Sequence, residues 1–202
     1  MDEADLQAVN GVLGGDGDAF EHLVRRYQHV LFDLALNLLG SAEEAEDAVQ
    51  CAFVKIYSSL ADFDQKRSFL NWAYTITLNI ARNRLRRRQL ISFIPFLSPG
   101  EDNAGGGEYA IEPAEPGASP DLQLSAGILR KDLGEAVANL PLDLRAPFVL
   151  FHIHRRPAKE VAEIMGLTTN AVSIRLFRAR ERLMKNLAPK YPEQFAAVDG
   201  LV

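Results

Sequence analysis

One segment of the chain, DFDQKRSFLNWAYTITLNIARNRLRRR (residues 62–88), interleaves aromatic and basic side chains. Aromatic rings stack on unpaired bases, and cations beside them neutralise the phosphates of a single strand. The segment therefore predicts a surface for single-stranded nucleic acid. The aromatic residues Phe63, Trp72 and Tyr74 are interleaved with Lys66, Arg67, Asn79 and the cluster Arg82, Arg84, Arg86, Arg87 and Arg88.

A second segment, RRPAKEVAEIMGLTTNAVSIRLFRARERLMKNL (residues 155–187), predicts a reader of duplex DNA. If its last helix buries Val172, Leu176, Ala179 and Leu183, the opposite face points outward near the helix start. Hydrogen-bonding and apolar groups there can reach base edges, while flanking cations meet phosphates. The expected outward residues are Thr169, Asn170, Ser173, Ile174, Phe177 and Arg178, and the expected phosphate contacts are Arg175, Arg178, Arg180, Arg182 and Lys185. The alternative is a plain helical hairpin with a solvated basic face, which leaves an exposed Phe177 without a structural role.

Catalytic chemistry finds little support in the sequence. His152 and His154 diverge if they lie two residues apart on a helix, and no well-spaced Cys or acidic ligand accompanies them. The run from Gly14 to Gly17 lacks the Lys-Ser/Thr ending of a phosphate-binding loop, and Cys51 has no cation beside it in sequence. We expect no enzyme activity, no metal and no cofactor.

The elements that position these residues are predicted to be helices throughout. Apolar residues recur at three- and four-residue steps from Phe20 to Leu38, and Gly40 ends that helix. A second helix begins at Ser41 with Glu44 completing a capping box, and a third spans roughly Ser68 to Arg88. The second helix carries an acidic and polar face formed by Glu43, Glu46, Asp47 and Gln50.

The second half of the chain predicts a helix-turn-helix. One amphipathic helix covers the region from Ile128 to Leu140, and Pro141 breaks it. Pro157 suits the start of the next helix, Gly166 its end, and Thr168 the cap of the last helix. Two helices joined by a short glycine-containing turn are typical of this DNA-binding motif.

The middle of the chain, residues 89–125, is rich in Pro and Gly, and residues 101–120 hold five acids and no base. Such a composition predicts a linker rather than a packed core. We therefore divide the chain into a helical domain (1–88), an acidic linker (89–125), a second helical domain (126–190) and a tail (191–202). The fold class is all-α, with two small domains.

The net charge of −5 conceals where the charges lie. Residues 65–90 carry seven bases and no acid, and residues 146–202 carry nine bases against five acids, whereas the rest of the chain is acidic. Nucleic-acid binding depends on this local potential rather than on the total. The single cysteine, the acidic first residues and the absence of a long apolar run predict a cytoplasmic protein without membrane insertion.

In both halves the sequence resembles a bacterial extracytoplasmic-function (ECF) sigma factor, a specificity subunit of RNA polymerase of the sigma-70 family. EDAVQCAFVKIYSSL (residues 46–60) looks like the family's polymerase-binding helix and FLNWAYTITLNIARNRLRRR (residues 69–88) like its promoter-melting helix. Residues 140–183 are similar to its helix-turn-helix domain. The resemblance covers about residues 15–88 and 128–188. Thr75 and Leu78 occupy positions that are often basic in the family.

The resemblance implies partners and roles for individual residues. Core RNA polymerase would meet the face with Glu46, Asp47 and Gln50, and an inhibitory anti-sigma factor is the family's usual regulator. Promoter DNA would be contacted at its duplex −35 element by Thr169, Asn170, Ser173, Ile174, Phe177 and nearby arginines. The single-stranded −10 element, with a flipped base, would be held by Phe63, Lys66, Arg67, Ser68, Trp72, Asn79, Arg82 and Arg86. The linker would pass through the polymerase's RNA exit channel.

Two other classes of protein remain open from the residues alone. An ordinary helix-turn-helix regulator would use its first domain as a sensor or a dimerisation module. A structural helical adaptor would not require the outward-facing residues of the last helix. The interleaved aromatic and basic residues of the first domain favour the sigma factor.

Overall fold

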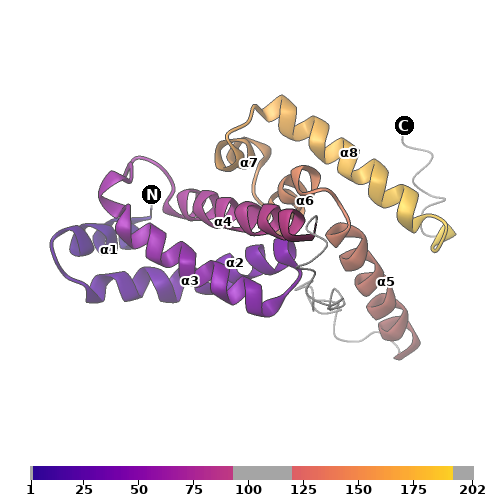
Figure 1. The fold of residues 1–202 in the computed structure, drawn as a ribbon, viewed down its shortest axis with the longest axis horizontal. Helices are drawn as coiled ribbons and strands as arrows, with labels where there is room; N and C mark the ends of the chain where they lie inside the picture. Colours follow the sequence, from indigo (N-terminus) through magenta and orange to yellow (C-terminus); the bar gives the residue numbers. More distant parts are fainter. Residues whose placement is uncertain (1, 93–119, 193–202) are drawn as a thin grey trace.

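The computed structural model describes residues 2–92 and 120–192, which fold into helices without a strand (Figure 1). The predicted all-α fold class is thereby confirmed. The first domain contains α1 (Glu3–Leu13), α2 (Asp18–Leu39), α3 (Ala42–Ser58), the short 3-10 turn η1 (Leu60–Asp62) and α4 (Phe69–Ser92). The second contains α5 (Pro120–Ala138), α6 (Leu142–Phe148), the π-helical turn η2 (Val149–Ile153), α7 (Ala158–Met165) and α8 (Thr169–Leu187).

Local sequence signals set the helix ends in the first domain. Gly40 ends α2 in the left-handed conformation, with φ of 76°, which glycine adopts without a steric penalty. The Ser41 hydroxyl accepts a hydrogen bond from the Glu44 backbone N–H at 3.4 Å and caps α3 as predicted. The apolar side of α3 is buried from Ala45 to Ile56, whereas Tyr57 near its end is exposed.

The helix α1 was not predicted, because its apolar pattern is weak. It is anchored by a polar contact: buried Asp5 accepts a hydrogen bond from the Tyr27 hydroxyl of α2 at 2.5 Å and pairs with Arg26 at 3.2 Å. From α1, Asn10 also accepts a hydrogen bond from Gln65 at 3.0 Å, in the loop before α4. The helix thus braces the loop that leads into the aromatic and basic segment.

The second domain is the predicted helix-turn-helix with an added irregularity. The helix α6 runs directly into η2, and Arg155 with φ of 54° then turns the chain toward α7. Gly166 ends α7 in the left-handed conformation, and the Thr168 hydroxyl caps α8 by accepting from Ala171 N–H at 3.2 Å. The expected inner face of α8 is confirmed as buried: Val172, Leu176, Ala179, Leu183 and Leu187.

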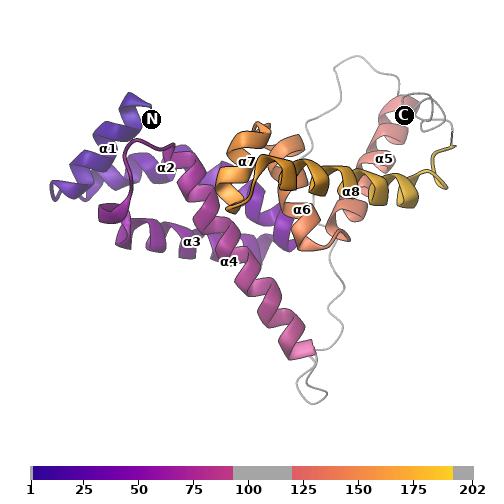
Figure 2. The same cartoon turned by 90° about the horizontal axis from the view of Figure 1, so that it is seen from above.

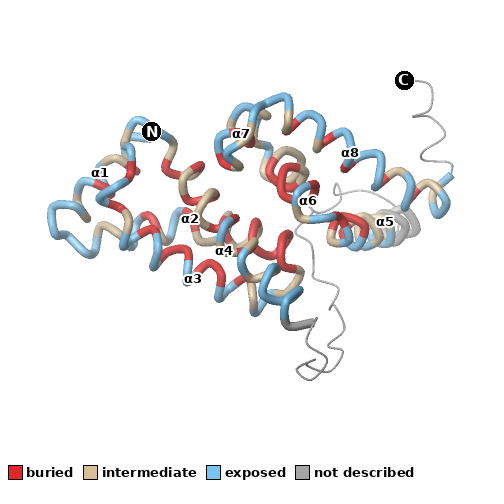
Figure 3. Tube along the Cα trace, turned by 45° about the horizontal axis from the view of Figure 1, so that its top comes forward, coloured by how far each residue is buried: buried red, intermediate tan, exposed pale blue. Residues whose placement is uncertain are grey.

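The two domains pack directly against each other. The helix α7 lies against α4, and α5, α6 and η2 contact α2 (Figure 2). Buried residues of both domains belong to one hydrophobic cluster, as the burial along α2, α4 and α6 shows (Figure 3). Leu38 and Tyr74 of the first domain and Leu150 and Ile164 of the second are each at most 2% exposed.

Helices occupy both ends of the predicted linker. The helix α4 continues to Ser92, beyond the expected boundary at residue 88, and α5 starts at Pro120 rather than near residue 126. Proline suits the first turn of a helix because its missing N–H has no partner there in any case. The acidic centre of the linker and its predicted path through polymerase lie outside the described residues. None of the helices in the described part of the chain has the length and hydropathy of a membrane span.

Candidate nucleic-acid interface

The aromatic residues of the first segment form a packed group in and before α4. The Phe63 ring lies 4.7 Å from Trp72 and 5.6 Å from Phe69, centre to centre. Phe63 is only 7% exposed, whereas Trp72 is half-buried at the edge of the core. Tyr74 is fully buried, so it does not belong to a stacking surface as the sequence suggested. Among Phe63, Phe69, Trp72 and Tyr74, Trp72 presents the most accessible ring.

The loop before α4 is shaped by its own backbone contacts. Asp64 accepts from the Lys66 N–H through its side chain at 3.0 Å and from the Arg67 N–H through its carbonyl at 2.9 Å. The Ser68 hydroxyl accepts from the Asn71 N–H at 3.3 Å, which is the geometry of a helix cap. Lys66 and Arg67 are both exposed, and Arg67 also pairs with Glu163 of α7.

Further along α4, Asn79 and Arg86 are exposed, and Arg82 donates to the Asn79 amide oxygen at 3.2 Å. Trp72, Asn79 and Arg86 are seven residues apart in turn, which is two helical turns, so they share one side of α4. The structure therefore brings a half-buried ring, an amide and two guanidinium groups to one face, next to the exposed loop cations.

Two arginines of the cluster, Arg84 and Arg88, contact side chains of α3. Arg84 pairs with Asp47 of α3 at 3.6 Å and approaches the Cys51 sulfur at 3.6 Å, while Arg88 pairs with Glu44. Two carboxylates of α3 thus contact α4, Asp47 from the acidic face and Glu44 beside it, which the sequence did not indicate. Asp47 keeps 62% of its side chain exposed, and Glu46, Gln50 and the apolar Val54 are exposed on the same helix.

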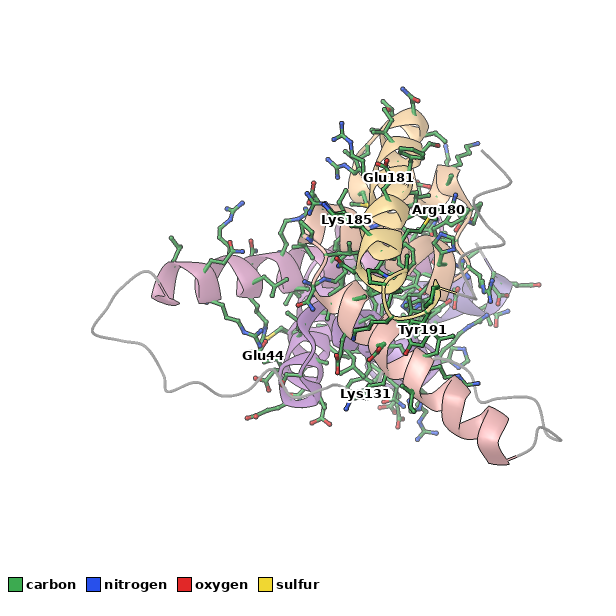
Figure 4. The ribbon with its side chains drawn as sticks, turned by 90° about the vertical axis from the view of Figure 1, so that its right-hand side faces the viewer. Glu44, Lys131, Arg180, Glu181, Lys185 and Tyr191 are labelled. Carbon is green, nitrogen blue, oxygen red and sulfur yellow. The ribbon has the colours of Figure 1, made fainter. Side chains whose placement is uncertain are left out.

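The outward face of α8 carries the predicted contact residues. Phe177 is 62% exposed and Ile174 is 45% exposed, although both are large and apolar. The Ser173 hydroxyl donates to the Thr169 carbonyl at 3.1 Å, and Ser173 is exposed. Thr169, Asn170, Arg178 and Arg180 are exposed, and Arg175 is half-buried. Arg180, Glu181 and Lys185 all extend from α8, and Glu44 extends from α3 (Figure 4).

His154 of the histidine pair contacts the first domain. The His154 ring stacks edge-on against Tyr74 with 5.4 Å between centres, and its Nδ1 lies 3.1 Å from the Tyr74 hydroxyl. Burial, with a smaller effect of Arg156, lowers the pKa of His154 to about 4, so the ring is neutral at pH 7. Burial also raises the pKa of Tyr74 to about 12. No group of three or more potential metal ligands lies within residues 2–92 and 120–192.

Contacts between the domains were missed from the sequence, since each joins residues far apart in the chain. Arg67 of the loop pairs with Glu163 of α7 at 3.1 Å. The Thr75 hydroxyl donates to the Ile164 carbonyl at 3.2 Å, and Arg145 donates to the Leu38 carbonyl at 2.8 Å. Thr75 stands where the resembling family often has a basic residue, and here its small hydroxyl meets the second domain.

Family models match both domains. Sigma-70 region 2 matches residues 23–91, and Sigma-70, region 4 matches residues 130–183. The first therefore runs from within α2 to the end of α4, and the second covers the C-terminal half of α5 and nearly all of the helix-turn-helix. The order of the two matches and their separation agree with the two domains and the linker of the chain.

Curated relatives match along nearly the whole chain. The RNA polymerase sigma-H factor of Pseudomonas aeruginosa is 31% identical over 93% of this chain and 95% of its own length. The ECF RNA polymerase sigma factor SigW of Bacillus subtilis is 30% identical, covering 89% of this chain and 94% of the relative. The ECF RNA polymerase sigma-E factor of Escherichia coli is 31% identical, covering 92% and 95%.

Two solved structures are similar in fold as well. One is the sigma factor RpoE in complex with the anti-sigma factor NepR from Bartonella quintana, with a TM-score of 0.61, 25% identity and coverage of 83% of this chain and 96% of that chain. The other is CnrH in complex with the cytosolic domain of CnrY, with a TM-score of 0.63, 25% identity and coverage of 92% and 97%. Together with the two exposed faces described above, these matches show that the chain belongs to the ECF sigma factors of the sigma-70 family, non-enzymatic subunits that direct RNA polymerase to promoters.

Proposed function

We propose that the two exposed faces divide promoter recognition between them, with α4 and its preceding loop holding the −10 strand and α8 recognising the −35 duplex. The observation that carries this assignment is the exposure of Phe177 and Ile174 among arginines, on a helix whose other face is completely buried. Apolar side chains so placed suit thymine methyl groups in the major groove.

On the first domain, the −10 strand would follow the loop and one side of α4. A base taken out of the stack costs a few kcal/mol, and stacking on an aromatic ring returns roughly 1–3 kcal/mol. Trp72 supplies the accessible ring, and Asn79 supplies both a donor and an acceptor for a base edge. Lys66, Arg67, Arg82 and Arg86 would neutralise the phosphates. Phe63 supports the ring of Trp72 from the core side rather than offering a surface of its own.

The polymerase contact is assigned to α3. Its exposed side chains Glu46, Asp47, Gln50 and Val54 form a mixed acidic and apolar surface, which suits a basic partner with an apolar patch. Assembly with core polymerase, as proposed, would take place in the cytoplasm. An anti-sigma factor is proposed as a further partner, because both similar solved structures are complexes, one of them named as an anti-sigma complex.

The assignment of the −10 element to α4 and of the −35 element to α8 is tested with polymerase reconstituted from core enzyme and the full chain. Two promoter libraries are used. One library randomises the −10 element and the other the −35 element. We expect Asn79→Ala to change the preferred −10 sequences alone and Phe177→Ala to change the preferred −35 sequences alone.

Glu181→Ala is the matched control for Phe177, since it alters another exposed side chain of α8. It should leave both rankings unchanged. An unchanged −35 ranking with Phe177→Ala would contradict the assignment of α8, and a shifted −35 ranking with Asn79→Ala would contradict the separation of roles.

A further inference from the structure

The turn that leads into the helix-turn-helix carries an arginine in an unusual backbone conformation. Arg155 lies between η2 and α7 with φ of 54°, and among residues 2–92 and 120–192 it is the one residue other than glycine with a positive φ. Glycine occupies this region without a steric penalty, as Gly40 and Gly166 do at the ends of α2 and α7. A strained position that holds an exposed, charged side chain indicates a use for that side chain beyond the fold.

The backbone on both sides of Arg155 is fixed by hydrogen bonds to η2 and the residue before it in the chain. The N–H of His154 donates to the Val149 carbonyl at 3.0 Å, and the N–H of Arg156 donates to the Leu150 carbonyl at 2.9 Å. The Arg155 side chain is therefore presented to solvent from a well-defined turn.

A second cation reaches the same turn from α8. The Nη2 atom of Arg180 lies 3.5 Å from Nε2 of His152 in η2. Because a guanidinium group can only donate, this contact needs Nε2 to be the unprotonated nitrogen of the ring. The rings of Phe148 and Phe151 lie against the imidazole, with 4.6 and 4.9 Å between centres. The imidazole is thus held in a place where it can orient the Arg180 side chain.

The charges of Arg155 and Arg180 act on this one imidazole. Burial lowers the pKa of His152, and the guanidinium groups of Arg180 and Arg155 lower it further. Within residues 2–92 and 120–192 neither arginine forms an ion pair with a carboxylate, whereas Lys190 of the same domain pairs with Asp132 at 3.0 Å. Two like charges beside one group repel each other, so an anion bound between them would be stabilised.

The position of this pair on the helix-turn-helix indicates which anion can reach it. Arg180 is three residues after Phe177, one helical turn further along α8, and Arg155 lies just before α7. In helix-turn-helix complexes the second helix enters the major groove while the first helix crosses the DNA backbone. A backbone phosphate of the duplex bound by α8 therefore meets the requirement.

We propose that Arg155 and Arg180 together form a phosphate-binding site for the duplex at the −35 element, with His152 as the positioning residue that orients Arg180. Arg180 was already an expected phosphate contact, and the structure adds Arg155 and His152 to it. The proposal rests on the function proposed above, in which α8 recognises the −35 duplex.

The test uses Arg155→Gly in the full chain, with and without core polymerase. Glycine suits the left-handed position, so the thermal midpoint of the free chain should stay the same or rise. In the assembled polymerase, promoter affinity should fall about two- to five-fold, and the slope of log affinity against log salt should decrease by about 1. Arg155→Lys keeps the charge and should keep the wild-type slope.

Lys190→Gln is the matched control, because Lys190 is an exposed cation of the same domain that already has Asp132 as its partner. It should leave the salt slope unchanged. The role of His152 is tested by two variants that differ in hydrogen bonding. His152→Gln keeps an acceptor for Arg180 and should keep the slope, whereas His152→Leu removes the acceptor and should reduce the slope. Equal slopes for these two variants would overturn the positioning role.

Three results would overturn the phosphate site itself. The first is a wild-type salt slope with Arg155→Gly, and the second is a lower thermal midpoint that accompanies the weaker binding, which would assign Arg155 to the fold. The third is weaker binding to core polymerase in place of DNA, which would assign the two cations to a protein partner. In each case the −35 library with Phe177→Ala still decides the proposed function of α8 independently.

Discussion

Asn79 and Phe63 are both assigned to strand capture, but their surroundings predict opposite consequences of mutation. Asn79 is exposed, so Asn79→Ala should change the free energy of unfolding by no more than about 0.5 kcal/mol. Phe63 is packed between Phe69 and Trp72, so Phe63→Ala should cost about 3–5 kcal/mol and obscure any effect on DNA. Asn79→Ala should reduce open complexes on duplex promoters and have a smaller effect on pre-melted ones.

Comparison of the two templates is the measurement, with open complexes detected by reactivity of unpaired bases. A defect of equal size on both templates would show that Asn79 contributes general DNA affinity and not strand capture.

Arg178 and Ile174 provide a matched pair on α8, one charged and one apolar, both exposed. Arg178→Ala should weaken binding to all −35 sequences and reduce the slope of log affinity against log salt by about 1, because one phosphate contact is lost. Ile174→Ala should leave that slope unchanged. Equal slopes for wild type and Arg178→Ala would remove Arg178 from the phosphate contacts.

His154 predicts a pH dependence of the folded protein. Its pKa is lowered by burial from 6.5 to about 4, so between these values the unfolded chain binds more protons than the native one. The free energy of unfolding should therefore fall as pH decreases from 6.5 to 4, by at most about 1.4 kcal/mol per pH unit from this residue. His154→Gln should flatten the profile in that window. A profile identical to wild type would mean that the ring is hydrated in solution.

At the scale of helices, α3 has two roles. It carries the proposed contact with polymerase, and it packs against α4. If Asp47 contacts a cation of core polymerase, Asp47→Arg should weaken binding by several kcal/mol, because it places two like charges at the interface. The variant also places a second cation beside Arg84, so Arg84→Gln is needed as a control for the lost ion pair. Because exposed pairs contribute at most about 1 kcal/mol, both variants should remain folded. Similar core affinity for Asp47→Arg and Arg84→Gln would assign Asp47 to internal packing instead.

Sequence patterns predicted those helices whose ends and buried faces are determined by residues close together in the chain. Gly40, Ser41, Gly166 and Thr168 end or cap their helices as expected, and the buried face of α8 followed from its spacing. The helix α1 escaped prediction because a buried carboxylate, Asp5, anchors it in place of a continuous apolar stripe. The π-helical turn η2 was not predicted from the sequence either. Its backbone hydrogen bonds join residues five apart, whereas those of an α-helix join residues four apart.

At the scale of the whole molecule, the candidate faces could be predicted and their mutual position could not. Residue types and spacing indicated the exposed side chains of α4 and α8. The contact of Arg67 with Glu163 depends on the packing of two separate domains, and no local pattern of charge distinguishes it from other exposed residues. The contact of Tyr74 with His154 of the second domain was missed for the same reason.

The most direct measurement of the account places photo-crosslinkers at residues 79 and 177, one on each proposed promoter face, in the full chain. In an initiation complex with core polymerase, the probe at 79 should crosslink to the non-template strand of the −10 element. The probe at 177 should crosslink to the −35 duplex of the same promoter. With the free chain, the same promoter should not be crosslinked at both positions in one molecule. Crosslinks from position 177 to polymerase instead of DNA, or paired crosslinks to one promoter without polymerase, would contradict the account.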